Sequence, residues 1–238
     1  MDATTRLCYL VPGALSAHPA GVAEGERREE YLRRHARPDT VVAIRDNPDG
    51  PASIESPEEE RAAARGLERM LPSAVVGFDA VIIGCFGDPG LAAARERVPV
   101  PVVGPAQASM HLAAQLGRRF GIITVVQDVI PVLEELVAGY GLRESLAGIS
   151  AVEVPVLELR DRRDEVMDTL LRDARSAVDQ GAEALVLGCM TMGFLDVAAD
   201  LQAAIGVPVV NPVLAALTTA EALTASGLVH AHPAPSPS

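Results

Sequence analysis

The sequence contains no lysine: all 20 basic residues in its 238 positions are arginines. A lysine amine is needed to hold pyridoxal phosphate or a substrate as a Schiff base, and the phosphate-binding P-loop also requires a lysine. The composition therefore excludes these two large classes of enzyme site.

The chain is also poor in positive charge and in long apolar runs. Its 32 acidic residues against 20 basic ones give a net charge of −12, which disfavours a nucleic-acid partner and an anionic membrane surface. No apolar run reaches the roughly 20 residues that span a bilayer, and residues 1–6 hold no apolar segment of a signal peptide. We therefore expect a cytoplasmic protein that acts on a small molecule and, by the common default, forms a homo-oligomer.

Cysteine is scarce, since only Cys8, Cys85 and Cys189 occur. An odd number of thiols spread over a chain of this size does not favour a disulfide framework, and we expect all three to be reduced. Hydrophobic residues make up 49% of the chain and aromatic ones only 3%. This length and composition are typical of one compact globular unit or of two small fused ones.

Short runs rich in Val and Ile alternate with longer segments of helical period, a pattern typical of βαβ units and a parallel sheet. Ser56 and Pro57 suit the N-cap and first position of an amphipathic helix, and residues 161–180 form another that stops at Gly181. The pattern predicts an α/β fold. We expect strands near residues 6–11, 40–45, 79–84, 100–103, 120–125, 150–156, 183–187 and 207–210.

An internal repeat is the main observation. Residues 79–105 and 183–212 each read as an acid, an apolar strand, Gly-Cys, a helix, Val-Pro-Val and a strand, and their cysteines lie nearly half the chain apart. The repeat predicts two similar α/β halves. We place them at 1–118 and 119–228, with a C-terminal helix near 212–226 packing on the first half and a disordered tail at 229–238.

Cys85 and Cys189 both follow strands, at the end of a parallel sheet where ligands bind and helix N-termini present free amides. Such amides favour the thiolate, so we expect the pKa of both thiols to be lowered. If the halves face each other, one thiolate can remove a proton from a carbon while the opposite thiol delivers another to its other face. The alternative is that each cysteine is a small buried hydrophobe, which we favour for Cys8 inside its apolar strand.

The segments "GCFGDPGLAAARE", "VPVVG", "FGIIT" and "LGCMTM…GVPVVNPV" together span roughly residues 75–228. They resemble the hydantoin racemase branch of the aspartate/glutamate racemase superfamily. The resemblance implies two pseudo-symmetric Rossmann-like parallel-sheet halves with the site in the cleft between them. It also implies racemisation that needs no cofactor and uses both cysteines, Cys85 and Cys189.

The first strand departs from that family, which ends it in Asn-Pro-Asn-Thr where this chain has "LVPGALSAH". Pro12 and Gly13 can still shape a backbone amide cradle, and Ser16 can replace a polar side chain. Amides after each cysteine would stabilise an enolate, and Thr124 ends the "FGIIT" strand, although its hydroxyl could instead bond the local backbone. We expect the substrate to contact Pro12, Gly13, Ser16, Phe86, Gly87, Thr124, Met190 and Thr191.

The expected reaction is racemisation of a 5-substituted hydantoin or a related cyclic amide. The strand-end loops that we can place contain no arginine, which favours a neutral ring over a dicarboxylate. The alternatives are an amino-acid racemase, a maleate-type cis-trans isomerase or a non-catalytic small-ligand binding protein. An arylmalonate decarboxylase fits least, because that branch keeps one cysteine.

Asp88, His230 and His232 are the remaining candidates. Asp88 could be a catalytic acid, but Asp-Pro-Gly also suits a helix N-cap, which we favour. His230 and His232 could mimic a metal pair, but a tail offers no rigid support for ligands. We therefore expect no metal and no cofactor.

Overall fold

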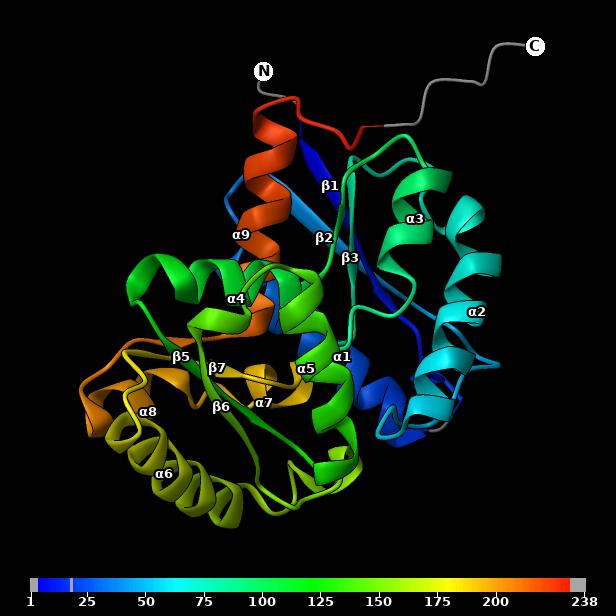
Figure 1. Cartoon of the computed structure of the whole chain (residues 1–238). Coiled ribbons are helices and arrows are strands. Elements are labelled where there is room, and N and C mark those ends of the chain that lie inside the picture. Colours follow the sequence, from blue (N-terminus) through cyan, green and yellow to red (C-terminus); the bar gives the residue numbers. More distant parts are fainter. Residues whose placement is uncertain (1–3, 18, 232–238) are drawn as a thin grey trace.

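The computed structural model describes residues 4–17 and 19–231, which form two four-stranded parallel sheets (Figure 1). The strand orders, β2-β1-β3-β4 and β6-β5-β7-β8, are equivalent, so the expected pseudo-symmetric α/β fold is confirmed. The strands are β1 (Thr5–Val11), β2 (Thr40–Asp46), β3 (Ala80–Ile83), β4 (Val102–Val103), β5 (Phe120–Thr124), β6 (Leu146–Ala151), β7 (Ala184–Leu187) and β8 (Val209–Val210).

Helices cover both faces of each sheet (Figure 1). They are α1 (Pro19–His35), α2 (Pro57–Ala74), α3 (Leu91–Arg97), α4 (Pro105–Leu116), α5 (Ile130–Gly139), α6 (Arg163–Asp179), α7 (Met190–Phe194), α8 (Ala198–Ile205) and α9 (Pro212–Ala225). Three short 3-10 helices are η1 (Gln127–Val129), η2 (Arg143–Ser145) and η3 (Val156–Glu158).

The predicted start of α2 is confirmed, because the Glu59 amide donates to the Ser56 hydroxyl at 3.3 Å and Pro57 is the first helical residue. The predicted position of the sixth strand was wrong. β6 is an edge strand of mostly half-buried residues, Leu146–Ala151, so it lacks the apolar run that marks the inner strands. The more apolar segment after it leaves the sheet at Glu153, which has a positive φ of 57°.

Each inner strand buries alternate side chains against different helices, as the period of two in a strand requires. In β1, Leu7 and Tyr9 belong to the core that includes residues of α1 and α9, whereas Cys8 and Leu10 belong to the core under α2 and α3. Cys8 is fully buried, and burial raises the pKa of its thiol to about 12. Its expected place in the core is confirmed.

The helices that follow the last strand of each sheet are exchanged between the sheets. α4 follows β4 of the first sheet but packs against β7 and β5 of the second, whereas α9 follows β8 of the second sheet and packs against β1, β3 and β4 of the first. α4 and α9 also contact each other. The exchange places the carboxyl ends of β3 and β7 on either side of one space.

The C-terminal segment is hydrogen-bonded to the first sheet at His230, within the part of the chain that the structure describes. The Val102 amide donates to Nε2 of His230 at 2.8 Å, whereas His232 lies outside the described residues. Within 4–17 and 19–231, no group of three or more His, Cys, Asp or Glu side chains is placed to hold a metal ion. None of the helices described is long and apolar enough to cross a membrane.

Candidate active site

The two Gly-Cys turns leave their sheets in the same way. The Gly84 amide donates to the Leu10 carbonyl at 2.7 Å, and the Gly188 amide donates to the Ile123 carbonyl at 2.8 Å. Each bond extends the ladder one residue beyond β3 or β7, so the next residue, a cysteine, stands at the carboxyl end of its sheet. The sequence repeat is therefore a repeat of geometry.

Glycine is required before each cysteine because the neighbouring strand is too close for a side chain. A Cβ atom at Gly84 would lie 2.8 Å from Cε1 of Tyr9, and one at Gly188 would lie 2.9 Å from Cγ2 of Ile122. Both contacts are with buried side chains. A side chain at either glycine would displace the cysteine turn.

One cavity of about 630 Å³ lies between the carboxyl ends of the sheets and is lined by both cysteines. Ser16 is the only expected binding residue that does not line it: Ser16 is exposed, and its amide donates to Oδ2 of Asp46 at 2.6 Å. The other expected residues do line it: Pro12, Gly13, Cys85, Phe86, Gly87, Thr124, Cys189, Met190 and Thr191.

Thr124 is fully buried, and its hydroxyl donates to the Gly188 carbonyl at 3.2 Å. The bond goes to the segment that follows the neighbouring strand β7, not to the local backbone that the sequence left open as the alternative, and Thr124 also lines the cavity. Since Gly188 precedes Cys189, the bond holds the second cysteine turn in place.

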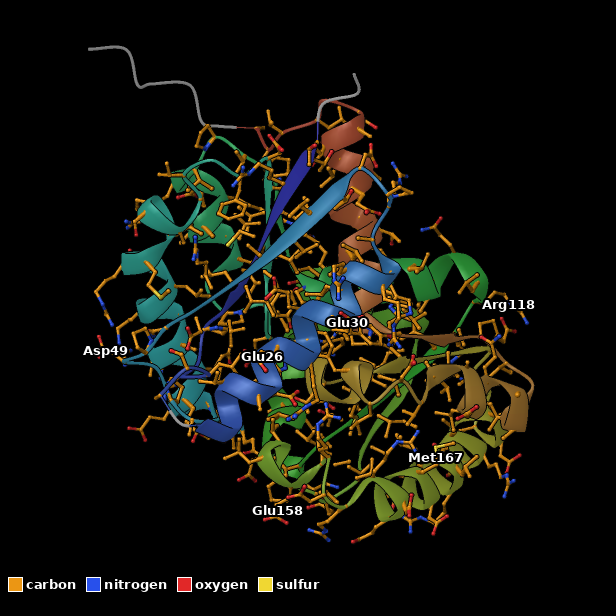
Figure 2. All side chains as sticks on the ribbon, turned by 180° about the vertical axis from the view of Figure 1, so that it is seen from behind. Glu26, Glu30, Asp49, Arg118, Glu158 and Met167 are labelled. Carbon is orange, nitrogen blue, oxygen red and sulfur yellow. The ribbon has the colours of Figure 1, made fainter. Side chains whose placement is uncertain are left out.

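A charged cluster from α1 forms one wall of the cavity. Arg27, Arg28 and Arg160 all line it, so the expectation that the strand-end loops bring no arginine to the site was wrong. Glu24 lies among them: its carboxylate accepts from Nε of Arg28 at 3.0 Å and from Nε of Arg160 at 3.0 Å. Figure 2 shows α1 lying across the junction of the two sheets, with Glu26 on its outer side. The inner side of α1 supplies Arg27 and Arg28, whereas Arg160 lies between η3 and α6, in the segment that follows β6.

Another part of the lining is apolar, and both halves contribute to it. Glu55, beside this wall, joins the halves because its Oε1 accepts from the Val156 amide at 2.8 Å. The apolar lining residues include Ile54, Phe86, Val129, Val132, Leu133 and Leu157.

The thiol of Cys85 is held in its protonated form. Burial raises its pKa to about 12, the Gly87 amide acts in the opposite direction, and Cys189, Asp88 and Glu60 raise the pKa further. The expected lowering of this pKa was wrong. A single backbone amide does not offset the loss of water and the nearby acids.

Cys189 has more groups that oppose the effect of burial. Burial outweighs the groups that oppose it and raises the pKa of its thiol, so the expected lowering was wrong for Cys189 too, although the amides of Met192 and Thr191, the charge of Arg28 and the Thr191 hydroxyl each lower it. Nη2 of Arg28 donates to Oγ1 of Thr191 at 3.0 Å. The environments of the two cysteines therefore differ, although the glycines before them are bonded to the neighbouring strands in the same way.

Asp88 caps a helix, but not the one that the sequence predicted. α3 has Gly90 as its N-cap, without a side-chain bond. The Asp88 carboxylate instead accepts from the Ala106 amide at 3.0 Å, the Gln107 amide at 2.9 Å and the Tyr140 hydroxyl at 2.7 Å. It thus closes the first turn of α4.

The family model described as Asp/Glu/Hydantoin racemase matches residues 18–220. The chain belongs to this family. It is 39% identical over 198 residues to a hydantoin racemase of Rhizobium meliloti, covering 82% of this chain and 80% of that protein. The structure of allantoin racemase from Klebsiella pneumoniae superposes with a TM-score of 0.83 at 32% identity, over 97% of this chain and 94% of that one. Allantoin racemase from Pseudomonas fluorescens gives a TM-score of 0.86 at 27% identity, over 98% and 99%. This chain is accordingly an isomerase of the racemase type.

Within this racemase framework, sequence reasoning missed Glu24, Arg28 and Arg160. Glu24 and Arg28 are spaced as i and i+4, which is the ordinary pattern of an exposed ion pair on a helix. Only the position of α1 across the cavity distinguishes them from such a pair. Arg160 lies near the start of the segment 161–180, whose charges the pattern assigned to solvent.

Proposed function

We propose that the chain racemises a 5-substituted hydantoin or a related cyclic amide without a cofactor, by proton transfer to and from Cys85 and Cys189. The observation that carries this is that two thiols stand at equivalent strand ends and line one cavity. The relatives named hydantoin racemase and allantoin racemase support the same substrate class.

The reaction needs one thiolate and one thiol on opposite faces of the ring. The thiolate takes the proton from C5, and the electron pair left behind is delocalised onto the oxygen of the adjacent ring carbonyl. The opposite thiol then gives its proton to the other face of C5, which inverts the centre. One proton leaves the substrate and one enters, so both cysteines exchange protonation state in each turnover.

Amides in both cysteine turns suit the developing negative charge on the ring oxygen. Met190 is the first residue of α7, where a backbone amide has no acceptor within the helix. Phe86 directly follows Cys85 and also lines the cavity, whereas the amides of Thr191 and Gly87 act on the two sulfurs. Amides fixed in this way stabilise an enolate without having to reorganise.

The charge of the cavity favours a neutral ring over a free acidic amino acid. Glu24 accepts bonds from Arg27, Arg28 and Arg160, so these guanidinium groups already have a carboxylate partner. The substrate carboxylate of aspartate or glutamate would have to compete with Glu24 for them. In all, the three arginines of the lining face three acids, Glu24, Glu60 and Asp161.

The size and apolar wall of the cavity suit a substituent on C5. A volume of about 630 Å³ is ordinary for a small-molecule site and exceeds what the five-membered ring itself fills. Val129, Val132, Leu133 and Leu157 give the substituent an apolar surface.

The test follows single enantiomers of 5-substituted hydantoins, and of aspartate and glutamate, in deuterium oxide. We expect loss of optical rotation with incorporation of one deuterium at C5 for the hydantoins. Cys85→Ser and Cys189→Ser should each lower racemisation by at least about 100-fold, the usual contribution of a positioned acid or base. Cys8→Ala, which removes a thiol from the core, is the matched control and should retain racemisation.

Each serine variant should still exchange the C5 proton of the enantiomer that faces its remaining cysteine. Near wild-type racemisation by both serine variants would refute the two-thiol mechanism. A higher kcat/KM for aspartate or glutamate than for every hydantoin would refute the substrate class.

A further inference from the structure

We propose that Arg28 is a positioning residue that places the negative charge of the thiol pair on Cys189, so that Cys189 is the first base and Cys85 the first acid. The inference rests on the proposed function, in which the two thiols are an acid-base pair. It adds which thiol removes the first proton, which the pseudo-symmetry of the fold alone does not determine.

Arg28 is fixed beside the second cysteine turn on several sides. Its residue is 8% exposed, Nη2 donates to Oγ1 of Thr191 at 3.0 Å, and Nε donates to Oε1 of Glu24 at 3.0 Å. The guanidinium carbon also lies 5.0 Å from the ring centre of Phe194. A charge held in this way acts on its neighbours continuously, unlike the charge of an exposed arginine.

Thr191 carries the effect of Arg28 to the sulfur of Cys189. A hydroxyl has one hydrogen to donate, and the Thr191 oxygen already accepts from Arg28, so its hydrogen is left for another acceptor. Thr191 is two residues after Cys189, in the first turn of α7. Both the charge of Arg28 and the Thr191 hydroxyl lower the pKa of Cys189 against the effect of its burial.

The first cysteine turn has no equivalent of this contact. The repeat aligns Thr191 with Gly87, which has no side chain, and a Cβ atom built there would lie 3.9 Å from the Cys85 sulfur. The charged groups that act on Cys85 include Asp88 and Glu60, and both disfavour a thiolate. The two turns therefore present a hydroxyl and a cation to one sulfur and two acids to the other.

The other titratable groups around the pair leave this order unchanged. Tyr9 on β1 interacts with both Cys85 and Cys189, so it does not separate them. The Glu24 carboxylate on α1 accepts hydrogen bonds from both Arg28 and Arg160, so its negative charge is balanced by two guanidinium groups.

A defined consequence follows for the reaction. The resting protein first accepts the enantiomer whose C5 hydrogen faces Cys189. Cys189 takes that proton, and Cys85 gives its own proton to the opposite face. The product state then carries the thiolate on Cys85, and a proton must return to Cys85 and leave Cys189 before the cycle repeats.

The test measures the alkylation rate of each cysteine by iodoacetamide as a function of pH, by peptide mass spectrometry. In the unaltered chain, the rate for Cys189 should rise at lower pH than the rate for Cys85. In Arg28→Met, the rate for Cys189 at pH 8, relative to its plateau at high pH, should fall about 10-fold, which is one pKa unit. The rate for Cys85 should change less than about 2-fold, because the Arg28 guanidinium is bonded to Thr191 in the turn of Cys189.

Two further variants and one control define the cause. Thr191→Val removes only the hydroxyl and should lower the rate for Cys189 less than Arg28→Met does, whereas Arg28→Lys keeps the charge and should restore part of the rate. Arg33→Met removes a charge from the same helix, where Arg33 pairs with Glu30 and its side chain is 73% exposed. This control should leave the alkylation of both cysteines unchanged.

Arg28→Met should fold because Glu24 keeps Arg27 and Arg160 as partners. If it does not fold, Arg28→Lys and Thr191→Val test the same order on their own. Equal pH profiles for the two cysteines, equal shifts in both, or the same effect from Arg33→Met would overturn the inference. Alkylation needs no substrate, so the pH dependence of the two alkylation rates tests this inference on its own. Absence of racemisation would refute the proposed function without changing that result.

Discussion

Glu24 joins α1 of the first half to Arg160 of the second, and replacing it with glutamine tests how much this buried cluster stabilises the chain. The change keeps the size of the side chain and removes its charge. The Glu24 side chain is 14% exposed and that of Arg28 is 9% exposed, with 3.0 Å between Oε1 and Nε. Glu24→Gln therefore leaves a nearly buried guanidinium without its carboxylate.

The expected loss lies between two limits. Breaking a buried ion pair by removing one partner costs about 3–5 kcal/mol, whereas an exposed pair contributes about 0–1 kcal/mol. Arg28 keeps its bond to Thr191 and its contact with Phe194, which lowers the cost. We therefore expect Glu24→Gln to reduce the free energy of unfolding at pH 7 by about 2–4 kcal/mol.

The loss should depend on pH with a defined sign. Burial raises the pKa of Glu24, but Arg28 and Arg160 outweigh it, so the pKa in the folded chain lies below the ordinary value of 4.5. A carboxyl with a lowered pKa contributes stability above its unfolded pKa and loses that contribution as the pH falls through its folded pKa. The difference between the two chains should be complete at pH 7 and should shrink below pH 4.5.

Urea unfolding followed by circular dichroism, at pH 7 and stepwise down to pH 3, measures this difference. Glu30→Gln is the matched control, since Glu30 lies on the outer side of the same helix (Figure 2) and pairs with Arg33, both side chains being more than half exposed. The control should change the free energy of unfolding by less than about 0.5 kcal/mol. A loss below about 1 kcal/mol for Glu24→Gln at pH 7, or a loss that does not vary with pH, would refute the reasoning.

Other substitutions test single contacts. Asp88→Asn should lower the free energy of unfolding by about 1–3 kcal/mol, since an amide cannot accept all three bonds of the carboxylate. The control Asp79→Asn, at an exposed residue, should lower it by less than about 1 kcal/mol. Urea unfolding measures both changes, and equal losses would contradict the role of Asp88 as a cap. Tyr9→Phe should leave stability unchanged or raise it by up to about 1 kcal/mol, because this buried hydroxyl has no partner among the described residues; a clear loss in thermal unfolding would contradict this. Gly13→Asn should cost about 1–3 kcal/mol rather than restore the family's donor, because its Cβ would lie 2.7 Å from the Pro51 carbonyl oxygen; an undiminished melting temperature would contradict this.

The cysteine turns could be predicted because all of the necessary information is local and occurs twice. A strand ends, a glycine permits close approach to the next strand, and a cysteine follows at the edge of the sheet. Gly84 and Gly188 have no side chain, and Tyr9 and Ile122 leave no room for one. The second copy of the pattern supplied what a single copy lacks, namely a reason to place both sulfurs in one cavity.

The contacts that differ between the halves could not be predicted in this way. Arg28 and Thr191 are 163 positions apart, and the position of α1 over the second half brings them together. Asp88 reaches α4 instead of α3 because α4 packs against the second sheet and brings its first turn to the carboxylate. Patterns along the chain report which side of a helix is apolar, but not which distant residue its polar side meets.

Racemisation limits what the difference between the two cysteines can achieve. The two enantiomers of a substrate have equal free energy in solution, so kcat/KM must be the same in both directions whatever the protein does. Arg28 cannot therefore make the proposed reaction favour one enantiomer overall. Any effect of Arg28 on kcat/KM must be equal in both directions, and what differs is which thiol holds the proton before the substrate binds. Equal kcat/KM in the two directions holds for any catalyst of this reaction, so the single cation beside Cys189 determines only where each cycle begins.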